Sequence, residues 1–182
     1  KSIMSIRIHG GSANGIMLKM PSAKTRPTSS RLKESLFGIL ESADLLRSSV
    51  ADLYAGSGAL GIEALSRGAE KCIFVESNRK NCHIIRDNLG LAKVLGGSVI
   101  NAHVGQWQAS NYGQISLVIA DPPYDDMNCW SNINDSLSGG LTKGATIVVE
   151  HRFNTMPPVD LVGLPLWRTR RHGDGAITIY RF

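Results

Sequence analysis

The chain has 182 residues, of which 42% are apolar and 19% charged, a composition typical of one soluble domain with its own core. No apolar run is long enough to span a membrane. We expect no signal peptide, because the first apolar residues alternate with Arg7 and His9. The three cysteines lack zinc-ligand spacing, so we expect buried thiols, no metal site and a reducing cytoplasm.

The net charge of +5 is unevenly distributed along the chain. Residues 1–50 carry eight Lys or Arg and three Asp or Glu, whereas residues 51–182 carry twelve of each kind. The whole excess of positive charge therefore lies in the first quarter of the sequence, where it would attract phosphates. On charge alone, a solvated basic face without a partner explains it equally well.

The first 25 residues predict a small β-hairpin, because two short apolar runs, 6–9 and 16–20, flank the turn-forming pair Gly10-Gly11. A helix is predicted over residues 28–46, where Leu32, Leu36 and Leu40 recur at helical spacing. We therefore expect a hairpin extension over residues 1–25 and one main domain over residues 26–182.

The main domain alternates short β-rich runs with helical patterns, which predicts an α/β fold with a mostly parallel sheet. The turn-forming triplet at 173–175 predicts an antiparallel hairpin at the end of the chain. The expected strands are 50–55, 72–76, 98–103, 115–121, 145–150, 166–172 and 176–182, and the expected helices are 59–67, 78–91, 129–138 and a weaker one at 105–110.

The strongest local motif is a glycine loop that follows the strand 50–55 and opens a helix. Gly56-x-Gly58-x-x-Gly61 lets the backbone turn sharply and approach a ligand, and Glu76 ends the next strand, where a carboxylate can accept ribose hydroxyls. Asp52 stands four residues before Gly56. Its carboxylate would pair with the ammonium of a methionine moiety but repel a pyrophosphate, which favours S-adenosylmethionine over NAD.

A second motif, Asp121-Pro122-Pro123-Tyr124, ends the strand 115–121. Loops at the carboxyl ends of parallel strands bind ligands, so we expect it near the glycine loop. The prolines remove two backbone donors and present carbonyl acceptors, Asp121 adds another acceptor, and Tyr124 offers an aromatic face for a base. This combination favours methylation of an exocyclic amino group.

The two motifs resemble class I methyltransferases that act on amino groups. Together with Arg7-Ile-His-Gly-Gly11, Arg26-Pro-Thr28 and Glu34-Ser-Leu-Phe37, they resemble the bacterial small-subunit ribosomal RNA guanine-N2 methyltransferase (RsmD) family over nearly the whole chain. The resemblance implies a Rossmann-like, seven-stranded sheet with an N-terminal hairpin. It also implies methyl transfer from S-adenosylmethionine to guanine N2 of 16S ribosomal RNA in assembling small subunits. We expect a cytoplasmic monomer.

The resemblance also implies a role for individual residues. The catalytic segment would be Asp121, Pro122, Pro123 and Tyr124. The cofactor would contact Asp52, Tyr54, Ala55, Gly56, Ser57, Gly58, Glu76, Ser77, His103 and Val104. The RNA would contact Arg7, Arg26, Thr28, Arg31 and Lys33.

Three other functions stay open on the sequence alone. A DNA adenine-N6 or cytosine-N4 methyltransferase would use the same Asp-Pro-Pro-Tyr chemistry, although the chain has no spare length to read flanking DNA. An NAD-dependent oxidoreductase would leave that segment without a role. A non-catalytic RNA-binding assembly factor would bind RNA regardless of Asp121. Arg168, Arg170 and Arg171 could contact RNA or protect a sheet edge by their charge.

Overall fold

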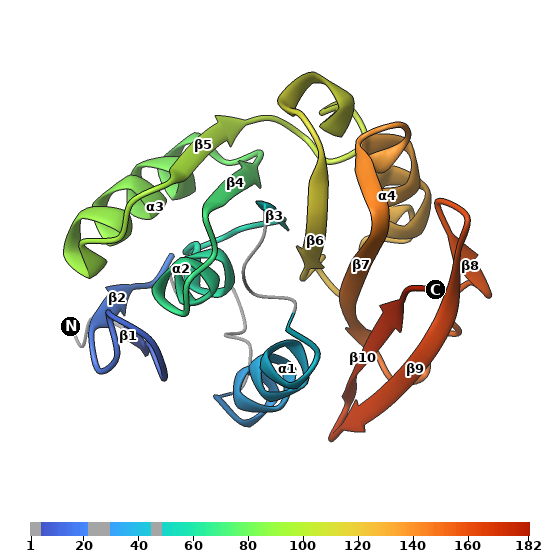
Figure 1. The fold of residues 1–182 in the computed structure, drawn as a ribbon, viewed down its shortest axis with the longest axis horizontal. Helices are drawn as coiled ribbons and strands as arrows, with labels where there is room; N and C mark the ends of the chain where they lie inside the picture. The colour runs from blue at the N-terminus through green and yellow to red at the C-terminus, as the bar shows by residue number, and fades with distance from the viewer. Residues whose placement is uncertain (1–4, 22–29, 45–48) are drawn as a thin grey trace.

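The computed structural model describes residues 5–21, 30–44 and 49–182, with side chains of the first helix from Lys33 onward. In this part of the chain, eight strands form one mixed sheet in the order β5-β4-β3-β6-β7-β10-β9-β8 (Figure 1). These strands are β3 (Ser49–Leu53), β4 (Lys71–Glu76), β5 (Gly97–Asn101), β6 (Ile115–Ala120), β7 (Leu141–Arg152), β8 (Asp160–Leu161), β9 (Leu164–His172) and β10 (Gly175–Tyr180). Strands β3 to β7 are mutually parallel, and β8, β9 and β10 pair antiparallel.

The two faces of the sheet are covered by different elements, as expected when strands alternate with helices. The helical elements are α1 (Ser30–Ser42), α2 (Ala59–Ser66), α3 (Arg79–Ala92), the short 3₁₀ helix η1 (Ala109–Tyr112) and α4 (Cys129–Leu137). Apolar residues of α1, α2 and α3 form one core cluster with one face of the sheet, which we call the α1 face. Residues of η1 and α4 form a second cluster with the opposite face.

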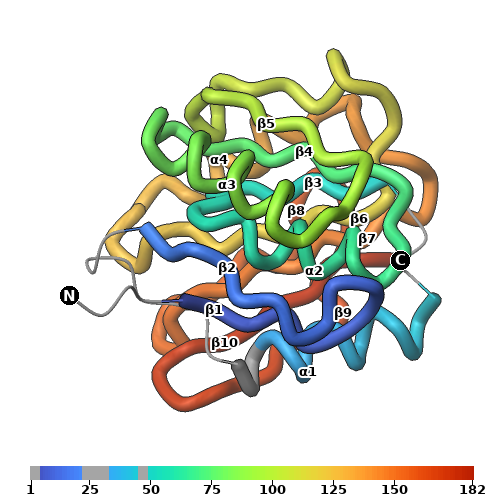
Figure 2. The backbone as a smooth tube through the Cα atoms, turned by 90° about the vertical axis from the view of Figure 1, so that its left-hand side faces the viewer, coloured from blue at the N-terminus to red at the C-terminus, as the bar shows by residue number. Residues whose placement is uncertain are grey.

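A separate two-stranded hairpin, β1 (Ser5–Arg7) and β2 (Met17–Lys19), packs on the α1 side of the molecule. Figure 2 shows it on the outside, in front of α2. Its Ile6, Ile8 and Leu18 are buried in the same cluster as α2 and α3. The hairpin therefore shares the core of the main domain, although its strands belong to their own small sheet.

Most predicted elements are present, with three differences. The mixed α/β fold and both hairpins are confirmed, and all three cysteines are buried and free. The sheet has eight strands rather than seven, because the two-residue strand β8 pairs with the start of β9. The weak helix at 105–110 is a 3₁₀ turn beginning at Ala109, since Gly105 has a φ of 100° that no α-helix accepts. Strand β7 begins at Leu141, four residues earlier than predicted.

Within the described ranges, no helix is long and apolar enough to cross a membrane.

Candidate active site

A cleft of about 540 Å³ opens at the carboxyl ends of the parallel strands, and its volume lies in the range of small-molecule sites. The loops after β3, β4 and β6 form its walls. Thirteen of the fourteen residues predicted to be catalytic or to bind the cofactor line it. The sheet thus brings the glycine loop and the Asp-Pro-Pro-Tyr segment together, although residues 62–120 separate them in the sequence.

Gly58 is the predicted residue that does not line the cleft. It precedes the first residue of α2 with a left-handed φ of 77°, and a Cβ there would lie 3.0 Å from Ile85 of α3. Its lack of a side chain therefore serves the turn and the packing of α2 against α3. The contact of Gly58 with the cofactor stays a prediction.

Asp52 ends up fully buried near the end of β3, where it orients the glycine loop. Its Oδ2 accepts a hydrogen bond of 2.9 Å from the backbone N–H of Gly61 in the first turn of α2. Burial raises the pKa of Asp52 well above its ordinary value, and the nearby carboxylates of Asp121 and Glu76 raise it further. A cation placed beside Asp52 would lower this electrostatic cost.

Glu76, at the end of β4, is held by two backbone groups. Its Oε2 accepts the N–H of Gly56 at 2.8 Å and its Oε1 accepts the N–H of Asn78 at 2.7 Å. Each carboxylate oxygen retains a second lone pair, so the group can still accept hydroxyl donors from the cleft. Its orientation is fixed before any ligand arrives.

Tyr54 has an unusual backbone conformation at the point where β3 enters the glycine loop. Its φ of 58° lies in the left-handed region, which costs a non-glycine residue free energy and often marks a functional site. The Tyr54 hydroxyl donates to Oδ2 of Asp126 at 3.3 Å. This contact links the glycine loop to the segment that follows Asp-Pro-Pro-Tyr.

The Asp-Pro-Pro-Tyr segment follows β6, beside β3 and β7 in the sheet. The Tyr124 hydroxyl donates to Oε1 of Glu150, near the end of β7, at 3.3 Å. A Cβ on Gly175 would lie 2.7 Å from that hydroxyl, so the glycine leaves room for it. The guanidinium of Arg152 lies 5.3 Å from the centre of the Tyr124 ring. Tyr124 is therefore positioned by the C-terminal half of the sheet.

The lining of the cleft is strongly acidic. It includes the carboxylates of Asp52, Glu76, Asp121, Asp125, Asp126 and Glu150. No Lys or Arg occurs among the described residues that line it. Such a cleft attracts a cationic ligand and repels a pyrophosphate, because like charges in a partly desolvated site interact strongly.

The residues predicted to contact RNA fall into three groups. Arg26 and Thr28, and the side chain of Arg31, lie outside the described part of the structure. Arg7 is exposed on β1, so its role stays a prediction. Lys33 is only 1% exposed, which contradicts the prediction that it contacts RNA.

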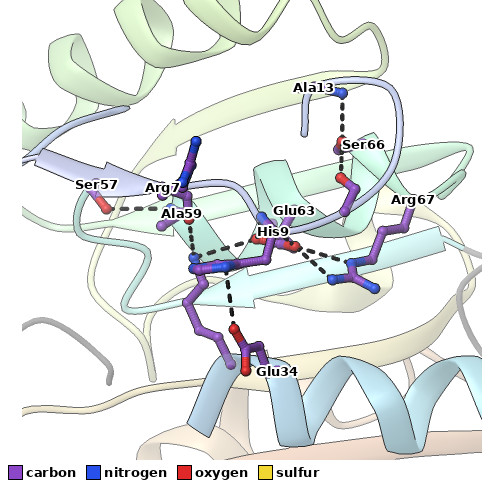
Figure 3. Close-up of polar contacts among 12 residues, drawn as sticks. Arg7, His9, Ala13, Glu34, Ser57, Ala59, Glu63, Ser66 and Arg67 are labelled. Atoms are coloured by element: carbon purple, nitrogen blue, oxygen red, sulfur yellow. Dashed lines mark hydrogen bonds and ion pairs between the residues drawn. The ribbon is translucent and has the colours of Figure 1, made fainter. Parts of the chain in front are cut away.

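Lys33 instead joins the hairpin to the main domain through Glu63, whose contacts with His9 and Arg67 are drawn in Figure 3. Its Nζ donates to the carbonyl of Arg7 at 2.9 Å and lies 3.3 Å from Oε2 of the fully buried Glu63 in α2. The carboxylate of Glu63 also accepts the backbone N–H of His9 and pairs with Arg67 at 2.9 Å. Burial lowers the pKa of Lys33, and the charge of Glu63 opposes this effect. Within α1, the side chain of Lys33 therefore points inward, toward Glu63.

Several lining residues were missed by the sequence analysis. Ile6, Met20 and Pro21 come from the hairpin, and no sequence pattern indicates that it closes the cleft. Asn132, from α4, also lines it. Glu150 could have been found, because the predicted strand 145–150 ends in a carboxylate at the same edge of the sheet as Asp121.

Comparison with known proteins agrees with this geometry. The family described as conserved hypothetical protein 95 matches residues 6–181. Ribosomal RNA small subunit methyltransferase D of Escherichia coli K12 is 32% identical over 178 residues, covering 97% of this chain and 89% of that protein. The enzyme of the same name from Haemophilus influenzae is 35% identical over 124 residues, covering 65% of this chain and 64% of that protein.

Two solved structures show the same fold. A hypothetical protein of Thermus thermophilus superposes with a TM-score of 0.84 and 26% identity, covering 97% of this chain and 99% of that one. The 16S rRNA N2 methyltransferase RsmC of Thermus thermophilus, solved with AdoMet and guanosine, gives a TM-score of 0.75 at 14% identity, covering 99% of this chain and 50% of that one. The chain therefore belongs to the conserved hypothetical protein 95 family, the RsmD-like family of S-adenosylmethionine-dependent methyltransferases.

Proposed function

We propose that this protein transfers a methyl group from S-adenosylmethionine to the exocyclic N2 amino group of a guanine in 16S ribosomal RNA. The observation that carries the proposal is that the glycine loop and the Asp-Pro-Pro-Tyr segment line one acidic cleft. The ribosomal substrate is supported by the name of the E. coli relative. We further propose that the enzyme acts as a cytoplasmic monomer on assembling small subunits.

The acidic cleft fits S-adenosylmethionine, which when bound supplies an electrophilic methyl group on a positively charged sulfur. Asp52 would hold its ammonium group, and the remaining lone pairs of Glu76 would accept its ribose hydroxyls. Ser77, His103 and Val104 also line the cleft and would flank the adenine. The absence of Lys and Arg among the described lining residues matches a cationic cofactor and disfavours NAD.

The Asp-Pro-Pro-Tyr segment would activate the amino group that receives the methyl. An aryl amine is a weak nucleophile because its lone pair is delocalised into the ring. The carboxylate of Asp121 and the carbonyl of Pro122 can accept its two N–H groups, which localises the lone pair and stabilises the positive charge that develops. The proton leaves the methylated nitrogen afterwards, so no strong base is required. Tyr124 would hold the base by stacking.

The proposal is tested with radiolabelled S-adenosylmethionine and three substrates: under-methylated 30S subunits, naked 16S ribosomal RNA and duplex DNA. We expect label in ribosomal RNA, recovered as N2-methylguanine after nuclease digestion. Label in DNA would instead support the alternative function, a DNA adenine-N6 or cytosine-N4 methyltransferase. Another labelled nucleoside from ribosomal RNA would keep the substrate and refute the assigned atom.

The variant Asp121→Asn tests the catalytic assignment. Asn keeps an oxygen acceptor but removes the negative charge that stabilises the positive charge developing on the amine, so kcat should fall by about 10²–10³-fold. Cofactor affinity, measured by calorimetry, should change little. Asp125→Asn is the matched control, since Asp125 is an exposed acid of the same cleft and should leave kcat nearly unchanged. Wild-type turnover in Asp121→Asn would contradict the mechanism.

A further inference from the structure

The second half of the chain carries a basic surface that its charge total conceals. Residues 152–182 contain five arginines and two aspartates. The net charge of residues 51–182 is zero because the six carboxylates of the cleft offset both the net +3 of this segment and the net +3 of the other residues. In the folded protein the two groups are separated, since the carboxylates line the cleft whereas most of these arginines lie on the C-terminal strands.

The strand register places two of these arginines on the α1 face. Arg168 pairs with Ile179 and Arg170 pairs with Ile177, and directly paired residues project from the same face of a sheet. Both isoleucines belong to the apolar cluster of the α1 face. Arg168 and Arg170 therefore form a row along β9 on that face.

The neighbouring Arg171 projects from the opposite face, because side chains alternate along a strand. It pairs with Ala176, and its guanidinium lies 4.1 Å from the centre of the Phe153 ring. Its Nε donates to the carbonyl of Gly173 at 2.9 Å. One strand thus carries exposed arginines on both faces, which provides a matched control.

The row on the α1 face leads to the candidate active site. His172 is two residues beyond Arg170, pairs with Gly175, and lines the cleft. On the far side of β10, Gly175 pairs with Arg152, whose guanidinium lies over the Tyr124 ring. Figure 1 shows the arrowhead of β9 at the end of the sheet where β6 and β7 also end. A chain of phosphates that starts at a base in the cleft could follow this row.

These guanidinium groups are available to a ligand. Arg168 and Arg170 are exposed, and in the described part of the chain neither forms an ion pair. Trp167 is 47% exposed, with the guanidiniums of Arg168 and Arg181 at 4.8 and 5.4 Å from its ring centre. Exposed indole beside positive charge is the combination that binds single-stranded nucleic acid by stacking and ion pairing.

We propose that Arg168, Arg170 and Trp167 form a docking surface for the RNA backbone next to the target nucleotide. The inference rests on the proposed function for the identity of the partner as RNA. Charge complementarity supports it, because an acidic cleft gives an RNA substrate no electrostatic attraction of its own. The competing explanation is that the arginines protect the edge of β9 from pairing with other strands.

The first experiment compares Arg168→Gln/Arg170→Gln with Arg171→Gln. The probe is a fluorescein-labelled 20-nucleotide single-stranded RNA, titrated by anisotropy between 50 and 200 mM KCl. The double variant should lose two phosphate contacts, which should lower its affinity for the RNA about tenfold. The negative slope of log K for association against log salt should become shallower by about 1.4. Arg171→Gln should retain the wild-type affinity and slope. Equal losses in both proteins, or no loss in either, would overturn the assignment of this face.

Trp167→Leu provides an independent test. Stacking is not electrostatic, so this variant should lose affinity about 5- to 100-fold with an unchanged salt slope. An unchanged affinity would remove Trp167 from the surface. Thermal unfolding controls for folding, because substitutions of exposed side chains seldom change stability by more than about 0.5 kcal/mol.

Methylation assays separate this inference from the proposed function. With 16S ribosomal RNA or 30S subunits as substrate, Arg168→Gln/Arg170→Gln should raise KM and leave kcat nearly unchanged, as expected for loss of uniform binding. If no substrate were methylated, the proposed function would be refuted. The anisotropy titration would still show whether Arg168 and Arg170 bind RNA. If methylation and RNA affinity both matched the wild type, the arginines would serve only to protect the edge.

Discussion

Burial of the Asp52 carboxylate makes the stability of the protein depend on pH, and the proposed cofactor contact at Asp52 would link that stability to cofactor binding. The folded state raises its pKa above the ordinary value of 3.8, chiefly through desolvation. The contribution of Asp52 to stability is therefore fully present below the pKa that this residue has in the unfolded state. It is lost as the pH rises through the pKa of Asp52 in the folded state. Above that pH, the folded protein without ligand holds a destabilising buried charge.

Asp52→Asn should separate these two effects. The amide oxygen can still accept the N–H of Gly61, so the glycine loop should keep its shape. Without cofactor, the variant should gain thermal stability over the wild type as the pH rises from about 4 to 8. S-adenosylmethionine affinity should fall about 10- to 100-fold, the effect of losing a hydrogen bond to a charged group. A pH-independent difference in Tm would contradict the buried-charge argument.

Tyr124 carries two functions that substitutions can distinguish. Its hydroxyl bonds to Glu150, whereas its ring is proposed to stack on the target base. Tyr124→Phe keeps the ring and loses only a long hydrogen bond to a neighbouring protein group, so kcat/KM should fall less than about tenfold. Tyr124→Ala should lower it about 5- to 100-fold further. Steady-state assays on ribosomal RNA would decide, and equal losses in the two variants would assign the whole effect to the hydroxyl.

At the scale of elements, the position of the hairpin depends on buried polar groups. Asn88 of α3, fully buried, donates to the carbonyls of Lys19 and Ser57 and accepts the N–H of Lys19. One side chain thus connects β2 to the glycine loop. The Lys33–Glu63 pair connects β1 to α1 and α2. The hairpin is therefore fixed at both strands, which keeps Ile6 in the wall of the cleft.

Lys33→Met should weaken this attachment. Removing one partner of a buried ion pair leaves an uncompensated charge, and we expect a loss of about 2–4 kcal/mol, moderated because Arg67 still neutralises Glu63. Urea unfolding measures the loss, and cofactor affinity should fall with it. Lys19→Met is the control, since the Lys19–Asp87 pair at 2.8 Å lies on the exposed side of the same hairpin. Comparable destabilisation by both variants would contradict the role of burial.

Across the whole molecule, cofactor binding should appear as a gain in stability. A ligand at 100 times its Kd stabilises the folded state by about 2.7 kcal/mol, which for a chain of this size raises Tm by roughly 5–10 °C. S-adenosylmethionine should produce this shift in a thermal scan, and NADH should produce none. A shift with NADH would mean that the acidic lining does not govern selection of the cofactor.

The sequence was sufficient to predict which residues lie in the cleft at the ends of the parallel strands. Asp52, Glu76 and Asp121 stand at the ends of parallel strands, and neighbouring parallel strands end at one edge. The rest of the cleft depends on tertiary contacts. Ile6 lines the cleft only because the hairpin docks on α2, and Lys33 is buried only because Glu63 lies opposite it. The basic row on β9 required the strand register, which a charge total cannot provide.

The position of β10 has a consequence for synthesis on the ribosome. This strand lies between β7 and β9, and all six of its residues are buried. Translation therefore produces both neighbours before the strand that joins them, so the sheet closes only after Tyr180 has left the exit tunnel. Because Gly175 and His172 line the cleft, a nascent chain acquires the complete cleft only at that stage.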